Sequence, residues 1–205
     1  MAGKSREYAG NRIVDAVINK WDHVYRQSDQ ARYPASQVLT ENNFLLPATG
    51  MALDLASGLG ANAIYLAERG LAVTAWDISF VAIDKLKAHA VQQGLNINAC
   101  QEKIAAASFI QCTFDVIVVS RFLDRTLSDA IIGALKPDGL LYYQTFTREK
   151  TSPKPPNNPD YLLAENEMLT LFSPLRVIYY RENALIGNQL RGLRNEAQFI
   201  GRKRN

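Results

Sequence analysis

The fold of this chain is decided by residues 52–63, which read ALDLASGLGANA, and by Ala75-Trp76-Asp77, which ends the next apolar run. The first stretch predicts a strand, a glycine turn and the start of a helix, and the second predicts a strand that ends in a carboxylate. Gly58 and Gly60 remove side chains where the backbone must bend sharply and approach a ligand closely. Asp77 lies nineteen positions after Gly58, where an acid in a β–α–β unit reaches the two hydroxyls of a ribose. The pattern therefore predicts a site for an adenosine-containing cofactor.

Two cofactor classes fit the glycines, and Asp54 separates them. Gly58-x-Gly60-x-x-Ala63 satisfies the dinucleotide pattern, although such a match alone is weak. Asp54 adds a carboxylate near the end of the first predicted strand, which would repel a pyrophosphate that prefers bare amides. S-adenosylmethionine has no phosphate and carries an ammonium and a sulfonium, which suit an acid at that place. The sequence favours S-adenosylmethionine, and a nucleotide-dependent oxidoreductase is the alternative.

The order D-x-x-x-G-x-G, followed by an acid after the second strand, resembles the class I S-adenosylmethionine-dependent methyltransferases. The resemblance covers roughly residues 21–180 and is strongest to small bacterial methyltransferases of the tellurite-resistance and thiopurine type. It rests on the run DLASGLGANAIYLAERG from Asp54 to Gly70 and on VTAWDIS from Val73 to Ser79. The resemblance implies a methyltransferase that uses S-adenosylmethionine as its cofactor. A protein that keeps this fold and binds the cofactor without catalysis is a second reading, because the class has no obligatory catalytic base.

Composition and charge set broad limits on the function. With 205 residues the chain is long enough for one domain with a full core, and 47% hydrophobic and 21% charged residues are ordinary for a globular protein. The formal net charge of +3 gives no strong signal for nucleic acid or for a membrane surface. Because no apolar run is long enough to span a bilayer and the N-terminus is polar, we expect a cytoplasmic protein. We also expect a small-molecule acceptor and no metal, and the sequence indicates no oligomeric state.

Alternation of apolar runs and amphipathic segments predicts an α/β fold with a doubly wound, mostly parallel seven-stranded sheet. The last two strands, joined without an evident helix, predict an antiparallel C-terminal hairpin, a feature of the methyltransferase fold. The expected strands are 51–55, 72–76, 97–100, 114–120, 140–145, 176–180 and 198–202, with a turn at 137–139. The expected helices are 13–27, 36–46, 61–69, 79–94, 127–135 and 161–172, and residues 1–12 are expected outside them. We expect a single domain over 1–205, with an N-terminal helical cap at 1–47 and a Rossmann-like core at 48–205.

In an open α/β sheet the ligand lies across the carboxyl ends of the strands, where the winding reverses. This rule predicts that the backbone around Ala56 and the Asp54 carboxylate face the methionine part of the cofactor. Asp77 is expected to bond the ribose and Ile78 to pack on the adenine. Gly58 and Gly60 complete the predicted cofactor loop.

Four further positions have open assignments. The resemblance implies an acid after the third strand that accepts the adenine amino group; Glu102 is the candidate and Gln101 the alternate. Ser120 and Arg121 end the fourth strand beside the cleft, and Arg121 is expected to bind substrate or the cofactor carboxylate, or to form an ion pair at the sheet end.

The resemblance also implies that the N-terminal cap folds over the cofactor, which makes Tyr25 and Tyr33 candidates for lining the substrate side or the lid. The proline-rich segment 151–160 is expected to be a loop and a candidate lid. No catalytic base is assigned.

Overall fold

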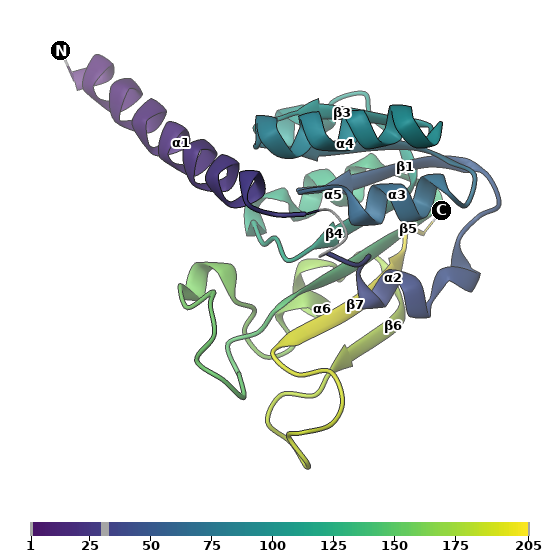
Figure 1. Cartoon of the computed structure of the whole chain (residues 1–205). Helices are drawn as coiled ribbons and strands as arrows, with labels where there is room; N and C mark the ends of the chain where they lie inside the picture. The colour runs from purple at the N-terminus through teal and green to yellow at the C-terminus, as the bar shows by residue number, and fades with distance from the viewer. Residues whose placement is uncertain (1, 30–32, 205) are drawn as a thin grey trace.

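The structure is a computed structural model that describes residues 2–29 and 33–204, with the backbone alone for residues 2–13. Within these residues the strands form one seven-stranded sheet in the order β3-β2-β1-β4-β5-β7-β6 (Figure 1). The strands are β1 (Gly50–Leu55), β2 (Leu71–Asp77), β3 (Ile97–Gln101), β4 (Phe114–Ser120), β5 (Leu135–Phe146), β6 (Arg176–Glu182) and β7 (Glu196–Arg202). The helices are α1 (Ala2–Arg26), α2 (Gln37–Glu41), α3 (Ala61–Ala67), α4 (Phe80–Gln93), α5 (Ser128–Ala134) and α6 (Glu167–Leu171).

The direction of the strands confirms the predicted fold class. Neighbouring strands from β3 to β5 pair in parallel, whereas β7 pairs antiparallel with both β5 and β6. The chain moves outward from β1 to β2 and β3, then returns to β4 on the other side of β1. The winding therefore reverses between β1 and β4, and a ligand cleft is expected at the carboxyl ends of these two strands.

Helices cover both faces of the sheet, as near-continuous apolar runs in β1 and β4 require. On one face α2, α3 and α4 contribute Val38, Leu66 and Leu86 to a core that includes Val118 and Tyr142. On the other face α5 and α6 contribute to a core around Tyr143 and Phe199 that also includes Ile131, Met168 and Phe172. A strand buried on both faces is held firmly, so the residues at its carboxyl end have a fixed position.

Helix α1 begins at Ala2, so the expectation that the first twelve residues lie outside the helix is wrong for residues 2–12, and residue 1 lies outside the described residues. Figure 1 shows its N-terminal half projecting away from the sheet while its C-terminal end lies beside the carboxyl ends of the strands. The described contacts of α1 with the core run to α4. The C-terminal end of α1 is thus the part of the N-terminal segment that can cover a ligand.

Two other segments differ from the sequence expectation. The helix expected at 161–172 is reduced to a 3-10 turn at Pro159–Tyr161 and to α6, because Leu163 N donates to Phe146 O and Arg148 N donates to Leu163 O. This pairing keeps the chain extended through Leu163. The turn expected at 137–139 lies inside β5, with Asp138 left-handed (φ 66°), and the β4–β5 register shifts there.

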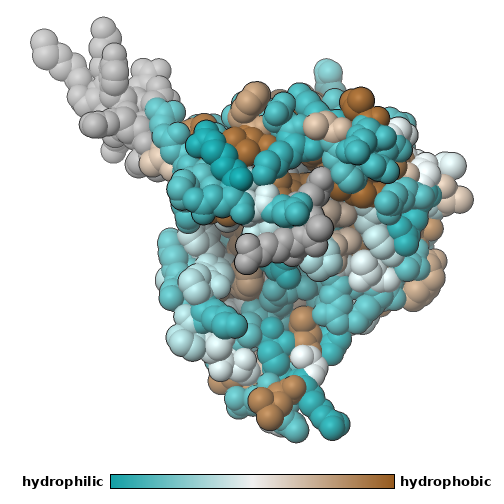
Figure 2. All heavy atoms as spheres, viewed as in Figure 1, coloured by the Kyte–Doolittle hydropathy of each residue, from teal (hydrophilic) through white to brown (hydrophobic). Residues whose placement is uncertain are grey.

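Loops gather where the parallel strands have their carboxyl ends, a side of the sheet that we call the carboxyl edge. The segment that follows β5 and the loop 183–195 between β6 and β7 both leave the sheet at this edge (Figure 1). Figure 2 shows apolar atoms at the end of loop 183–195, where Ile186 and Leu190 are exposed. The segment after β5 and the loop 183–195 therefore both border the carboxyl edge.

Candidate functional site

The glycine loop after β1 has the backbone that a close ligand contact requires. Ala56, Gly58 and Gly60 all have left-handed backbones, with φ of 55°, 53° and 80°. Such a conformation is unfavourable for alanine and suits glycine, and non-glycine residues held there cluster at functional sites. The Ser57 hydroxyl is buried and has no hydrogen-bond partner within the described residues. An orphaned buried hydroxyl beside a glycine cradle fits a polar ligand at this loop.

Asp77, at the end of β2, holds the glycine loop in place. Its Oδ2 accepts from Gly58 N at 2.7 Å and its Oδ1 accepts from Ser79 N at 2.8 Å. Burial raises the pKa of the Asp77 carboxyl above its usual value, against these two backbone bonds. Each carboxylate oxygen has a second lone-pair direction, so the group can still accept from ribose hydroxyls.

Asp54 is completely buried, and its carboxyl group is hydrogen-bonded to the first turn of helix α3. Its Oδ2 accepts from Ala63 N at 3.0 Å, and its Oδ1 accepts from the side chain of Asn62 at 3.3 Å. Asn62 in turn accepts from Ser36 N at 2.8 Å, which joins α3 to the segment before α2. Asp54 therefore fixes the first turn of α3, and its predicted contact with the methionine part stays a prediction.

The burial of Asp54 predicts a pH-dependent stability. Burial raises its pKa from 3.8 to about 7, and the bonds from Asn62 and Ala63 only partly oppose this effect. Between these values the folded protein keeps a proton that the unfolded chain has lost. The unfolding free energy should therefore fall as pH rises from about 4 to about 7, by up to ~1.4 kcal/mol per pH unit from this group.

Denaturant titrations of the wild type and of Asp54→Asn across this pH range provide the measurement. The variant cannot titrate at this position, so its stability should fall less steeply, and equal slopes would contradict the buried, protonated Asp54. Asp15→Asn is the matched control, because Asp15 is exposed on α1.

The C-terminal end of α1 is fastened over the glycine loop. A Cβ placed on Gly58 would lie 2.8 Å from the Tyr25 hydroxyl oxygen, so the tyrosine covers the loop directly. Lys85 Nζ donates to the carbonyls of Tyr25 and Ser28 at 2.7 and 2.9 Å. Burial raises the Tyr25 pKa well above its usual range, and the nearby charge of Asp77 acts in the same direction. Tyr25 therefore covers the glycine loop, and its role in lining the substrate side or the lid stays a prediction.

Asp22 is a site residue that the sequence did not indicate. It is 9% exposed, and its Oδ1 accepts from the Ser79 hydroxyl at 2.5 Å and from Val81 N at 3.3 Å. Ser79 also caps α4 by accepting from Ala82 N. The charge of Asp22 contributes to the raised pKa of Asp77. The partner of Asp22 is 57 positions away, so no local pattern could identify this contact.

The residues predicted on the adenine side lie together at the ends of β2 and β3. Glu102 N donates to Asp77 O at 2.8 Å, and the side-chain amide of Gln101 donates to Ile78 O at 3.0 Å. The Glu102 carboxylate accepts from the Ser108 hydroxyl at 2.6 Å. Gln101 thus contacts Ile78 and Glu102 contacts Asp77, and the assignment of the adenine contact to either of them stays a prediction.

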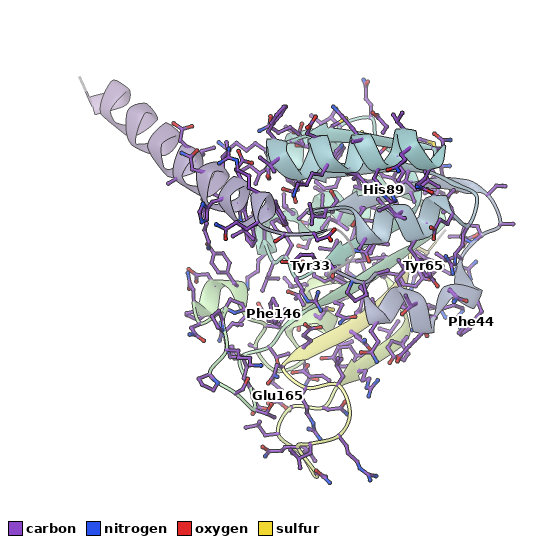
Figure 3. The ribbon with its side chains drawn as sticks, in the orientation of Figure 1. Tyr33, Phe44, Tyr65, His89, Phe146 and Glu165 are labelled. Carbon is purple, nitrogen blue, oxygen red and sulfur yellow. The ribbon has the colours of Figure 1, made fainter. Side chains whose placement is uncertain are left out.

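The end of β4 forms the other half of the edge. Ser120 is half-buried, and Arg121 takes a left-handed backbone with φ 54°. Arg121 Nε donates to Glu196 at 3.2 Å, which is the ion pair at the sheet end that was one of its open assignments. The Tyr33 hydroxyl lies 3.3 Å from the Ser28 hydroxyl, and the side chain is 38% exposed (Figure 3).

The described residues offer neither a metal site nor a membrane-spanning helix. No group of three or more histidine, cysteine or acidic residues among them could hold a metal ion. None of the helices in the same residues has the length and apolar character to cross a membrane. The cytoplasmic location expected from the sequence stays a prediction.

The comparisons with known proteins agree with this geometry. Residues 52–139 match the family model described as a methyltransferase domain. A probable S-adenosyl-L-methionine-dependent methyltransferase, TehB of Haemophilus influenzae, is 31% identical over 140 residues, which are 64% of this chain and 48% of the relative. A ubiquinone biosynthesis O-methyltransferase of Coxiella burnetii is 33% identical over 101 residues, which are 47% of this chain and 43% of the relative. The chain thus spans about half the length of the curated relatives it matches.

A solved structure extends the similarity beyond the matched domain. The crystal structure of TehB from Haemophilus influenzae superimposes with a TM-score of 0.65 and 25% identity, covering 82% of this chain and 61% of the other. These findings confirm the predicted resemblance. Residues 52–139 are thus similar to the methyltransferase domain of S-adenosylmethionine-dependent enzymes.

Proposed function

We propose that this chain, whose residues 52–139 are similar to a methyltransferase domain, is an enzyme that transfers a methyl group from S-adenosylmethionine to a small-molecule acceptor. The observation that carries the proposal is the set of three buried carboxylates, Asp22, Asp54 and Asp77, around the glycine loop. Burial is the main cause of the raised pKa of Asp77 and of Asp54, and the charges of Asp22 and Asp77, respectively, add to it. Such a set favours a cationic ligand and disfavours a pyrophosphate, which argues against the oxidoreductase alternative.

The residues at the loop fit this cofactor. The backbone of Ala56, Gly58 and Gly60 would border its methionine part, with the Asp54 carboxyl near its ammonium, whose positive charge would favour the ionised form of Asp54. Asp77 would accept from the ribose hydroxyls, and Ile78 and Glu102 would border the adenine. When bound, S-adenosylmethionine supplies a methyl group on a positively charged sulfur, which is a reactive leaving group.

The task left to the protein is alignment and exclusion of water, which can supply most of the acceleration in such a displacement. The end of α1 suits this task because Tyr25 covers the loop and Lys85 holds the helix end down. We accordingly propose residues 1–47 as a cap on the core 48–205. The lid role of 151–160 remains a prediction, with Thr151 N donating to Asn195 Oδ1 at 2.6 Å at its base.

The small-molecule acceptor is a proposal supported by two observations. One relative is named for a step of ubiquinone biosynthesis, whose product is a small molecule. The formal charge of +3 on 205 residues is low for a protein that must hold a nucleic acid.

The experiment is a calorimetric titration of the purified chain with S-adenosylmethionine, S-adenosylhomocysteine and NAD. The proposal expects micromolar binding of the first two and none of NAD. Tight NAD binding without S-adenosylhomocysteine binding would overturn it. Transfer of labelled methyl groups to a panel of small acceptors then separates the enzyme from a protein that only binds the cofactor.

A further inference from the structure

A network of polar side chains joins β5, β7 and the end of β4 at the carboxyl edge. Glu196, the first residue of β7, accepts from Arg121 Nε at 3.2 Å and from the side-chain amide of Gln144. The Gln144 side-chain oxygen accepts from Val38 N at 2.9 Å and from the Gln198 amide at 3.1 Å. Glu196 is therefore held by β5 on one side and by Arg121 on the other.

The stability of the fold does not require this network of buried polar side chains. Gln144 is 3% exposed and Gln198 is 0% exposed, and the residues two positions away on the same face, Tyr142 and Ile200, are large and belong to the buried core. Burying polar side chains is costly unless every group is hydrogen-bonded, and apolar residues of similar size would serve stability as well. Its evident effect is to fix the Glu196 carboxylate, whose side chain is only 12% exposed, and through it the Arg121 guanidinium.

Arg121 is placed to bind a ligand. It follows β4 directly, its left-handed backbone is held by a bond from its N–H to Gln144 O at 2.8 Å, and its side chain is 47% exposed. Only Nε has a partner among the described residues, so the two Nη groups are available. A guanidinium fixed in this way presents paired donors that match a carboxylate.

An aromatic side chain lies next to this group. Phe146, the last residue of β5, is directly opposite Glu196 in the β5–β7 register, and opposed residues share one face of a sheet. Its side chain is half-buried (Figure 3). The edge thus combines a planar apolar surface with a fixed cation.

We propose that Arg121 binds a carboxylate of the methyl acceptor, with Glu196 as its positioning residue and Phe146 as the apolar contact. The acceptor class is a small aromatic carboxylate. This inference rests on the proposed function and, of the assignments left open for Arg121, takes the one that places it on the acceptor side. The acids of the cofactor half end β1 and β2, whereas Arg121 and Glu196 border β4, β5 and β7 on the other side of the reversal point.

The test titrates the full chain, saturated with S-adenosylhomocysteine, with phenylacetate and with the uncharged phenylacetamide. We expect phenylacetate to bind about tenfold more tightly than the amide, and Arg121→Met to remove this preference. Arg202→Met is the matched control, because Arg202 is 42% exposed and paired with Asp138 at the opposite edge of the sheet. The control should leave the preference unchanged.

Variants of Glu196 test the positioning role. Glu196→Gln keeps an acceptor for Arg121 Nε and should retain most of the preference, whereas Glu196→Leu should lose it at an unchanged affinity for S-adenosylhomocysteine. The inference is overturned if phenylacetate does not bind, if it binds no better than the amide, or if Arg121→Met leaves its affinity unchanged. It is also overturned if Arg121→Met weakens the binding of S-adenosylhomocysteine, because Arg121 would then contact the cofactor. Failure of the wild type to bind S-adenosylhomocysteine would instead refute the proposed function.

Discussion

Asp77→Ala is expected to weaken S-adenosylhomocysteine binding by roughly thirty- to several-hundred-fold, or about 2–4 kcal/mol. Two charge-assisted bonds to the ribose hydroxyls account for this range. The side chain is 5% exposed, so little water competes for its oxygens. Calorimetric titration of the wild type and the variant measures the change.

The structure adds a second consequence of the same substitution. Asp77 accepts from Gly58 N and Ser79 N, and its removal leaves both donors without this acceptor. An unsatisfied buried donor costs about 1–3 kcal/mol, so Asp77→Ala should also lower the unfolding free energy. Asp77→Asn keeps one oxygen acceptor and should fall between the wild type and the alanine variant in both measurements.

A matched control separates loss of the ligand contact from general destabilisation. Asp115 also accepts from a backbone donor, Met51 N at 2.7 Å, but this contact lies at the start of β4, at the opposite edge of the sheet. Asp115→Asn should affect stability and leave S-adenosylhomocysteine affinity unchanged. A folded Asp77→Ala variant with wild-type affinity would remove Asp77 from the site.

The sequence was sufficient for the parts of the site that local patterns encode. The glycines and the acid at the end of β2 both depend on residues within one β–α–β unit, where spacing determines geometry. The parallel order of the strands followed for the same reason, because each crossover helix is visible as an amphipathic segment.

The remaining contacts depend on residues far apart in the chain. Arg121 meets Glu196 across 75 positions, and Lys85 meets the carbonyl of Tyr25 across 60. The one available signal was the presence of two amide side chains, Gln144 and Gln198, in the strands β5 and β7. The missed extension through Leu163 has the same origin, since its pairing with the end of β5 overrides local helix preference.

The largest stability loss is expected for Gly60→Ala, at the start of α3. Its φ of 80° is left-handed, which costs an alanine about 1–2 kcal/mol. A Cβ there would also lie 2.5 Å from Cδ2 and 2.9 Å from Cγ of Leu86. Leu86 is 0% exposed and cannot move freely, so overpacking should add about 1–3 kcal/mol. Denaturant unfolding should therefore show a loss of about 2–5 kcal/mol.

Gly94→Ala provides the comparison that isolates the collision. Gly94 ends α4 with a left-handed φ of 64°, but a Cβ there would have nothing within 4 Å. Its replacement should cost only the backbone strain, and equal losses for the two glycines would refute the steric argument. Because Gly60 begins the helix whose Ala63 N holds Asp54, we also expect Gly60→Ala, but not Gly94→Ala, to weaken S-adenosylhomocysteine binding in the fraction that remains folded.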